Sequence, residues 1–171
     1  MAGQSERVLK GLAAGLVGGL VASWTMNRFQ ELWFSVGNND QPEEASPASS
    51  DEPDDTTVRT AAAISEGLFD HKLTKAEKKI AGPAVHYSLG TGVGGLYGAV
   101  AEVAPEVTSV AGLPFGAAFW LVVDEGAVPV LGLAKGPTAY PLSTHVYALT
   151  SHFVYGLTTE LVRRSVRKAL R

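Results

Sequence analysis

Five ionisable side chains lie inside stretches of the sequence that are otherwise apolar: His86, Asp124, Glu125, His145 and His152. Ionisable groups in an apolar helical segment are energetically costly, so they usually face a protein interior or a water-filled cavity. Histidine titrates near neutral pH and can exchange a proton with a neighbouring carboxylate. These five residues, called the polar cluster below, are therefore the first candidates for chemistry.

Three interpretations of the polar cluster remain open. In the favoured one the cluster is structural, because polar residues between membrane helices often serve only to join them. In the second it conducts protons or cations across a membrane. In the third it binds a transition metal, since two or three histidines with a carboxylate suit zinc. The tight histidine spacings of known zinc motifs are missing, so we predict no metal site.

No other motif indicates catalysis. The sequence contains no cysteine, which excludes disulfides, iron–sulfur clusters and thiolate zinc sites. No serine lies in a nucleophile elbow, and the glycine-rich run 90–95 lacks the strand and turn of a nucleotide-binding loop. We therefore expect no enzyme, no catalytic residue and no cofactor. The net charge is −3, and no basic surface for a nucleic-acid partner is indicated.

Four apolar segments can position the polar cluster, and each is long enough to cross a membrane as a helix: residues 8–26, 80–103, 110–133 and 141–162. If they cross the bilayer in alternation, a rise of about 1.5 Å per residue places His86, Asp124 and His145 in one leaflet and His152 near the midplane. The predicted fold class is an all-α polytopic membrane protein with four transmembrane helices and one amphipathic interfacial helix. The lipid bilayer is its first expected partner.

The first two apolar segments each carry a glycine at every fourth position. The repeats are Gly11, Gly15 and Gly19 in the first segment, and Gly90, Gly94 and Gly98 in the second. This spacing puts the glycines on one helix face, where two backbones can approach closely in lipid. It predicts that the two segments pack antiparallel, with Gly15 near Gly94. If the repeats instead face outward, they specify a homo-oligomer or a contact with another membrane protein.

The segments between the apolar stretches complete the predicted organisation. An acidic stretch rich in Pro and Ser is typical of a disordered linker. Thr74 and Glu77 match a capping box, so a helix is expected to start there. The predicted division is a first membrane helix at 1–35, an acidic disordered linker at 36–57, an amphipathic helix and helix start at 58–79, and a bundle of three spans with a basic C-terminal tail at 80–171.

The first apolar segment has a second interpretation, as a secretory signal peptide. A basic start and an apolar centre are followed by Val21-Ala22-Ser23, a tolerable cleavage site. The glycine repeat favours a retained helix, because a discarded peptide needs no packing device. Basic residues divide equally between the two sides of the membrane. Charges in long loops steer orientation less, so we expect the termini in the cytoplasm.

Three further polar residues lie near predicted helix ends: Arg28, Glu102 and Glu160. Arg28 reaches the side of the membrane on which most of the polar cluster lies, and we expect it to pair with one of the two acids there. Glu160 precedes Arg163 and Arg164 by three and four residues, which is the spacing of an ordinary helical ion pair.

Two blocks of the sequence form a pattern over about residues 73–168. The first contains His86, a glycine-rich apolar run, Tyr97, Ala101-Glu102-Val103 and Pro105; the second contains His152-Phe153-Val154-Tyr155-Gly156, Glu160, Arg163 and Arg164, with Pro129 and Gly132-Leu133 between them. This pattern resembles the YagU-like inner-membrane proteins of bacteria. The resemblance implies a small multi-pass protein of the bacterial inner (plasma) membrane and supplies neither a substrate nor catalytic residues. The acidic linker and the pair Asp124-Glu125 depart from the pattern.

The sequence as a whole predicts a non-enzymatic inner-membrane protein whose polar cluster is mainly structural. The alternative is a proton- or cation-conducting carrier or channel that uses the same cluster. Short loops and little soluble mass also favour self-association. The two glycine faces could, however, pack on each other within one chain.

Overall fold

The computed structural model describes residues 2–37 and 55–170, and this part of the chain is all-α, as predicted. Its α-helices are α1 (Ala2–Gly37), α2 (Thr56–Phe69), α3 (Lys75–Val100), α4 (Leu113–Val122), α5 (Val128–Val130) and α6 (Leu142–Ala169). Two 3₁₀ helices, η1 (Pro105–Gly112) and η3 (Pro137–Ala139), and a π-helical segment, η2 (Val123–Ala127), connect them. Most of the predicted acidic linker lies outside the described residues.

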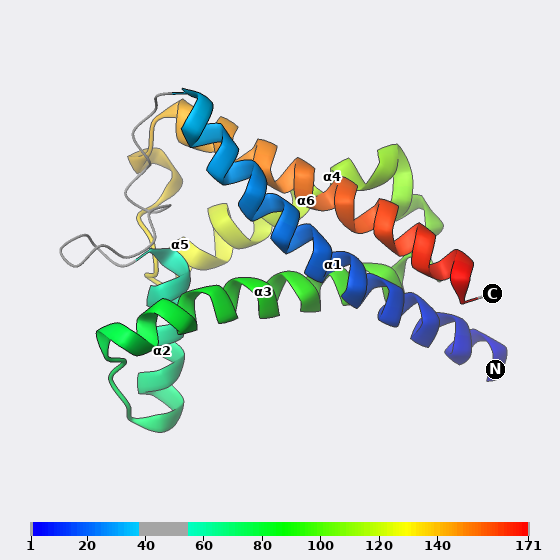
Figure 1. Ribbon diagram of the computed structural model, residues 1–171, viewed down its shortest axis with the longest axis horizontal. Helices are drawn as coiled ribbons and strands as arrows, with labels where there is room; N and C mark the ends of the chain where they lie inside the picture. Colours follow the sequence, from blue (N-terminus) through cyan, green and yellow to red (C-terminus); the bar gives the residue numbers. More distant parts are fainter. Residues whose placement is uncertain (1, 38–54, 171) are drawn as a thin grey trace.

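The long helices form one bundle. α1 packs on α3 and on α6, α4 packs on α6, and α2 packs on α3. Figure 1 shows both termini at one end of the bundle and α2 at the other end. The chain therefore brings the start of α1, the end of α3 and the end of α6 to the same end.

The glycine repeats of α1 and α3 face each other, which is the arrangement that their spacing predicts. A side chain at Gly15 would collide with the backbone of Gly94 and Gly98, and one at Gly94 would collide with the backbone of Gly15 and Gly19. α4 and α6 make a similar contact, in which Gly156 packs on Gly116. Close backbone approach at small residues is characteristic of helix pairs in lipid.

The third apolar segment, predicted as one helix over 110–133, is interrupted near both ends. Before α4 the backbone turns sharply, because Val110, Ala111 and Gly112 all have positive φ. After α4 the helix widens into η2. Pro129 follows this π-helical turn; a proline donates no N–H and crowds the carbonyl four residues earlier, so the wider turn accommodates it.

α3 and α6 both extend beyond their predicted apolar segments. The capping box before α3 is confirmed: the Thr74 N–H donates to the Glu77 carboxylate at 2.7 Å, and the Glu77 N–H donates to the Thr74 hydroxyl at 3.3 Å. Pro83 therefore lies two turns inside α3, which begins at Lys75. α6 continues to Ala169, so the basic tail is helical.

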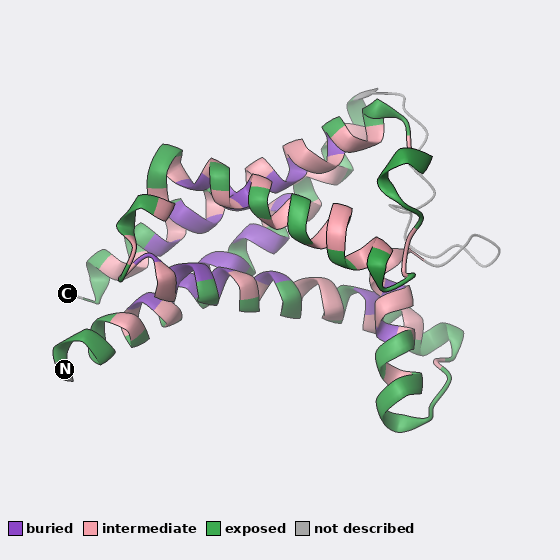
Figure 2. Cartoon of the chain, turned by 180° about the vertical axis from the view of Figure 1, so that it is seen from behind, coloured by how far each residue is buried: buried purple, intermediate pink, exposed green. Residues whose placement is uncertain are grey.

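The interior holds small, aromatic and polar side chains. Its buried residues include Ala14, Ala22, Ser23, Ser151, Tyr155 and Thr159. Large aliphatic side chains face outward instead; Leu9, Leu96 and Leu121 are 63%, 63% and 59% exposed. Figure 2 shows the buried residues on the helix faces that meet inside the bundle. This distribution is the reverse of the one that a water-soluble core requires.

Two stretches of the described residues are long and apolar enough to cross a membrane, Gly3–Val36 and Pro105–Val130. The prediction of four such helices is therefore met only in part. α3 and α6 are long, but their glycine, threonine, histidine and charged residues lower the average hydropathy. The predicted amphipathic helix is present as α2, which begins at Thr56 and buries Val58 and Ala61.

Candidate functional site

The two acids of the polar cluster pair with two histidines of α6. Glu125 Oε1 lies 2.7 Å from His145 Nδ1, and Asp124 Oδ2 lies 3.7 Å from His152 Nε2. The other nitrogen of the His145 ring, Nε2, lies 3.0 Å from the Pro137 carbonyl oxygen. The two pairs, called the acid–histidine pairs below, join η2 to α6.

The π-helical turn positions both acids. His145 and His152 are seven residues apart and share one face of α6, whereas adjacent residues of an α-helix point about 100° apart. In η2 the turn is wider, because the Val128 N–H donates to the Val123 carbonyl, five residues earlier. Consecutive side chains therefore point in more similar directions in this turn than in an α-helix. As a result, Asp124 and Glu125 can both contact α6.

In the described part of the chain, neither His86 nor Arg28 forms a hydrogen bond or an ion pair with these acids and histidines. His86 lies against α1, with Nε2 3.5 Å from the Ser23 carbonyl oxygen. Arg28 forms an ion pair of 2.5 Å with Glu31. The expected pairing of Arg28 with an acid of the polar cluster is wrong, because Glu31 offers a carboxylate one turn away on the same helix. Among the described residues, no group of three or more His, Asp or Glu side chains is placed to hold a metal ion.

An aromatic layer fills the bundle beside the acid–histidine pairs. The Phe119 ring lies edge-on to the His152 ring, with centroids 5.2 Å apart. Phe115 stacks on Tyr97 with centroids 4.0 Å apart. Tyr155 is buried and contacts both phenylalanine rings. The layer packs α3, α4 and α6 together and separates the acid–histidine pairs from the end of the bundle that holds the termini.

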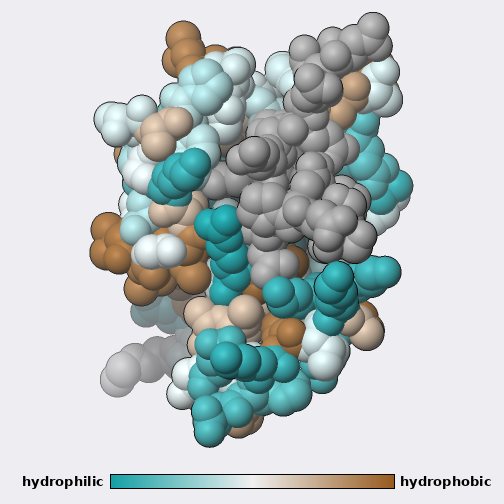
Figure 3. Space-filling model, turned by 90° about the vertical axis from the view of Figure 1, so that its left-hand side faces the viewer, coloured by the Kyte–Doolittle hydropathy of each residue, from teal (hydrophilic) through white to brown (hydrophobic). Residues whose placement is uncertain are grey.

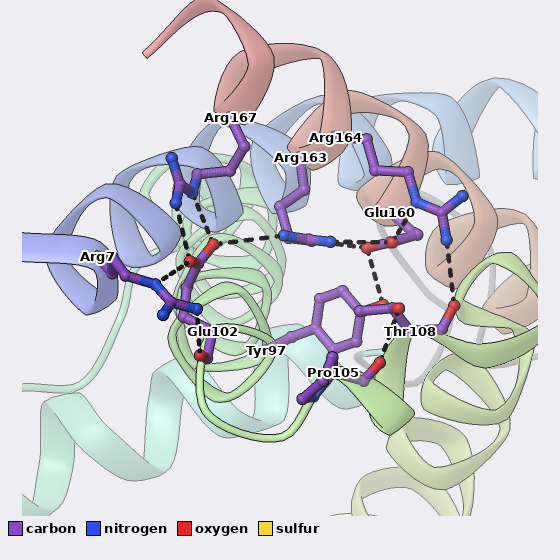
Figure 4. Close-up of polar contacts among 9 residues, drawn as sticks. All are labelled: Arg7, Tyr97, Glu102, Pro105, Thr108, Glu160, Arg163, Arg164 and Arg167. Atoms are coloured by element: carbon purple, nitrogen blue, oxygen red, sulfur yellow. Dashed lines mark hydrogen bonds and ion pairs between the residues drawn. The ribbon is translucent and has the colours of Figure 1, made fainter. Parts of the chain in front are cut away.

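A second polar group lies at that end, and sequence analysis did not assemble it. It contains two carboxylates and four guanidinium groups and is called the charge network below: Glu102, Glu160, Arg7, Arg163, Arg164 and Arg167 (Figure 4). Its members come from α1, from the turn after α3 and from α6. The network therefore joins three segments that are far apart in the sequence.

Glu160 is the buried centre of the charge network, with none of its side chain exposed. It accepts hydrogen bonds from Arg163 Nε at 2.6 Å, Arg164 Nε at 2.5 Å and the Tyr97 hydroxyl at 2.9 Å. Arg164 also donates to the Thr108 carbonyl at 3.2 Å. A buried carboxylate stays charged only where such donors replace water. The helical pair expected from spacing is present, but it is one part of a contact between α6, α3 and η1.

Glu102 is the second centre and lies just after α3. Arg167 donates two hydrogen bonds to its carboxylate, at 2.6 and 2.8 Å. Arg163 and Arg7 each approach the same carboxylate to 3.8 Å. Arg7 also donates to the Glu102 backbone carbonyl at 3.3 Å. Through Glu102, α1 and α6 are held to the end of α3.

The sequence contains one part of the pattern that predicts this network. Arg163 and Arg167 are four residues apart, which places both on one face of a helix. From the sequence alone, both belong to the predicted basic C-terminal tail. Their partner Glu102 lies on another segment, and only the antiparallel packing of the bundle brings the end of α3 beside the end of α6.

Comparison with known proteins identifies a family but no activity. No curated protein and no solved structure matches the chain. The model of the family described as "Protein of unknown function (DUF1440)" matches residues 50–161, about two thirds of the sequence. The match includes both acid–histidine pairs and both carboxylates of the charge network, and it leaves all of α1 and the last turns of α6 outside. The chain therefore belongs to the DUF1440 family.

Proposed function

We propose that the protein is a non-enzymatic, multi-pass protein of the bacterial inner membrane, and that its polar groups hold the membrane helices together. The outward position of the large aliphatic side chains carries this proposal. Leu, Val and Ile side chains on the outside of α1, α3, α4 and α6 would be costly in water and are at no disadvantage in lipid. The inner-membrane location follows the resemblance to the YagU-like proteins.

The same pattern supports α3 and α6 as the second and fourth spans, with the membrane part of α3 beginning near residue 80. Part of their low average hydropathy comes from residues that face inward, such as Gly94, Ser151 and Thr159. Their outward residues include Leu96 and Leu161, which are exposed. A span whose polar side chains all have protein partners does not need uniform hydrophobicity.

The surface at the opposite end from the termini supports an interfacial position for α2. In Figure 3 the lower part of this face, over α2 and the start of α3, is mostly hydrophilic, with hydrophobic side chains beside it. Ile64, Leu68 and Phe69 of α2 are exposed. A short helix with this mixture lies at a membrane surface more readily than it crosses one.

Fractionation and topology reporters test the proposal. The protein should remain in bacterial membranes after an alkaline carbonate wash. Fluorescent-protein fusions at the C-terminus should fluoresce, and alkaline phosphatase should be active when fused within residues 38–54 and inactive at the C-terminus. A soluble protein would refute the membrane assignment, whereas an active C-terminal phosphatase would refute only the cytoplasmic position of the termini.

A proton- or cation-conducting role is the second candidate, and the two adjacent acid–histidine pairs favour it. Protein in liposomes that contain a pH-sensitive dye separates the two roles. Flux that is lost in a His145→Ala/His152→Ala variant and kept in a His86→Ala control would support conduction. If the parent shows no flux and the double variant unfolds at a lower temperature, the pairs are structural.

Self-association is a further proposal, with a constraint from the packing. Both glycine repeats are used by contacts within one chain. A homo-oligomer or a membrane-protein partner would therefore use another face, such as the outer face of α4 around Leu121 and Val122, where both side chains are exposed. Crosslinking from this face, compared with crosslinking from Leu9 on α1, measures which face meets a second chain.

A further inference from the structure

A cationic pocket opens at the end of the bundle where the termini meet. Its volume is about 440 Å³, and it is lined by Arg7, Glu102, Arg163, Arg164, Arg167 and Lys168. Five of these six side chains are cationic, and they come from both α1 and α6. The turn after α3 contributes the single carboxylate.

The charges in this pocket do not balance. Among the described residues, the pocket wall and the layer beneath it hold these five cations and two carboxylates, Glu102 and Glu160, which leaves an excess of three positive charges. Both carboxylates already accept hydrogen bonds from arginines of α6. A concave site lined by charge of one sign focuses its field and concentrates counter-ions. The charge of the pocket therefore favours an anionic ligand.

The cations that border the opening still have donors for a ligand. Arg7 and Arg164 have side chains that are 66% and 53% exposed. Arg164 uses two of its five N–H groups in the contacts to Glu160 and Thr108. Within the described part of the chain, Lys168 takes part in none of the ion pairs. By contrast, Arg163 and Arg167 are held in place by Glu160 and Glu102 and form the rigid wall.

A neighbouring hollow adds an apolar wall. It has a volume of about 630 Å³, shares Arg7 and Glu102 with the cationic pocket, and is also lined by Ala101, Val103 and Pro105. A molecule with a phosphate group and an attached apolar part would fit the two together. Planar guanidinium groups match phosphate oxygens, which they bind through paired hydrogen bonds.

We infer that this pocket binds a phosphate group, carried either by an anionic phospholipid or by a small soluble phosphate compound. The phospholipid source rests on the proposed membrane insertion, which places the pocket at the cytoplasmic surface of the bilayer, where anionic headgroups lie. The soluble source requires only the fold.

Binding to detergent-purified, delipidated protein tests this inference. Native mass spectrometry measures retention of phosphatidylglycerol against phosphatidylcholine, and calorimetry measures binding of inorganic phosphate. The test variant is Arg7→Gln/Lys168→Gln, which removes two cations without touching the buried Glu160. Its control is Lys72→Gln/Lys135→Gln, which removes two cations outside the pocket.

We expect the parent and the control to prefer phosphatidylglycerol, or to bind inorganic phosphate, and the test variant to bind on the order of tenfold more weakly. Preference for the lipid alone assigns a headgroup, and binding of phosphate alone assigns a soluble ligand. Equal retention of both lipids with no phosphate binding overturns the inference, as does equal weakening in test and control variants. Carbonate extraction of the same variants reports separately on membrane insertion.

Discussion

The Tyr97 hydroxyl donates a 2.9 Å hydrogen bond to the Glu160 carboxylate across 63 positions of sequence. The bond connects α3 to α6 inside the bundle, where Glu160 is fully buried. The Tyr97 ring also stacks on Phe115 of α4. One tyrosine therefore links the charge network to the aromatic layer, and its two contacts can be removed separately.

Replacing Tyr97 by phenylalanine should remove the hydrogen bond and keep the ring stack. A hydrogen bond to a charged group contributes roughly 1.5–3 kcal/mol, so we expect a loss of that size in the free energy of unfolding, measured by denaturant titration in detergent. Tyr87→Phe is the matched control, because the Tyr87 hydroxyl accepts a longer bond of 3.3 Å from Asn27. Equal losses in the two variants would contradict a special role for the Tyr97 hydroxyl.

Glu160→Gln should destabilise the protein more strongly. The change leaves the buried Arg163 without its nearest counter-charge, and breaking a buried ion pair costs about 3–5 kcal/mol. Glu106→Gln at the same end of the bundle is the control, because Glu106 is exposed, and it should change stability by less than about 0.5 kcal/mol. Thermal unfolding of both proteins in the same detergent measures the difference. A small effect at Glu160 would show that the charge network does not hold α6 in place.

Gly94→Ala should weaken the packing of α1 on α3. An added methyl group would meet the Gly19 Cα at 2.6 Å, and the backbone cannot move away without separating the helices. We expect a cost of about 1–3 kcal/mol, as for other overpacked interiors. Gly92→Ala lies on the same helix with no atom within 4 Å of the added group, so it should be neutral or stabilising. If both substitutions have the same effect, the glycine repeat is not a packing surface.

Acid should open the first turn of α3. The hydrogen bond that the Thr74 N–H donates to Glu77, with further bonds from the Thr74 and His71 side chains, lowers the pKa of Glu77 below its ordinary value of 4.5. A lowered pKa in the folded state means that the stabilisation is present above the unfolded value and is lost as pH falls through the folded one. Amide exchange at residues 75–78 should therefore become faster in acid than in neutral solution, after correction for intrinsic rates. Glu77→Gln should remove most of this pH dependence; an unchanged profile would count against the cap.

The sequence predicts contacts that depend on local spacing and misses those that depend on how helices are placed. Gly15 and Gly94 were paired correctly because a four-residue repeat specifies a helix face without reference to the rest of the fold. Thr74 and Glu77 were identified as a cap for the same reason. The pairing of Asp124 with His152 needs a π-helical turn, which follows from Pro129 only when the surrounding helix is known. Glu102 and Arg167 meet because α3 and α6 end at the same end of the bundle. No local sequence pattern predicts this arrangement.

Average hydropathy selects two of the four predicted spans. Hydropathy summed along α6 counts Thr159 and Glu160 as if they faced lipid, although both are buried among protein groups. The same average over Pro105–Val130 is high, because that stretch is mostly apolar, and little of it is buried. Average hydropathy therefore underestimates a helix whose polar side chains are covered by other protein groups.

The closing of the charge network on Glu102 also orders the events of biosynthesis. Arg7 leaves the ribosome with the first helix, and Arg163 and Arg167 emerge only with the last one. Until α6 has been made, Glu102 lacks Arg167, the partner that donates two hydrogen bonds to it, and has only Arg7 of the charge network beside it. A chain cut short before Arg163 would also leave Glu160 without both of its arginine partners. The network is therefore complete only in a chain that has been synthesised as far as Arg167.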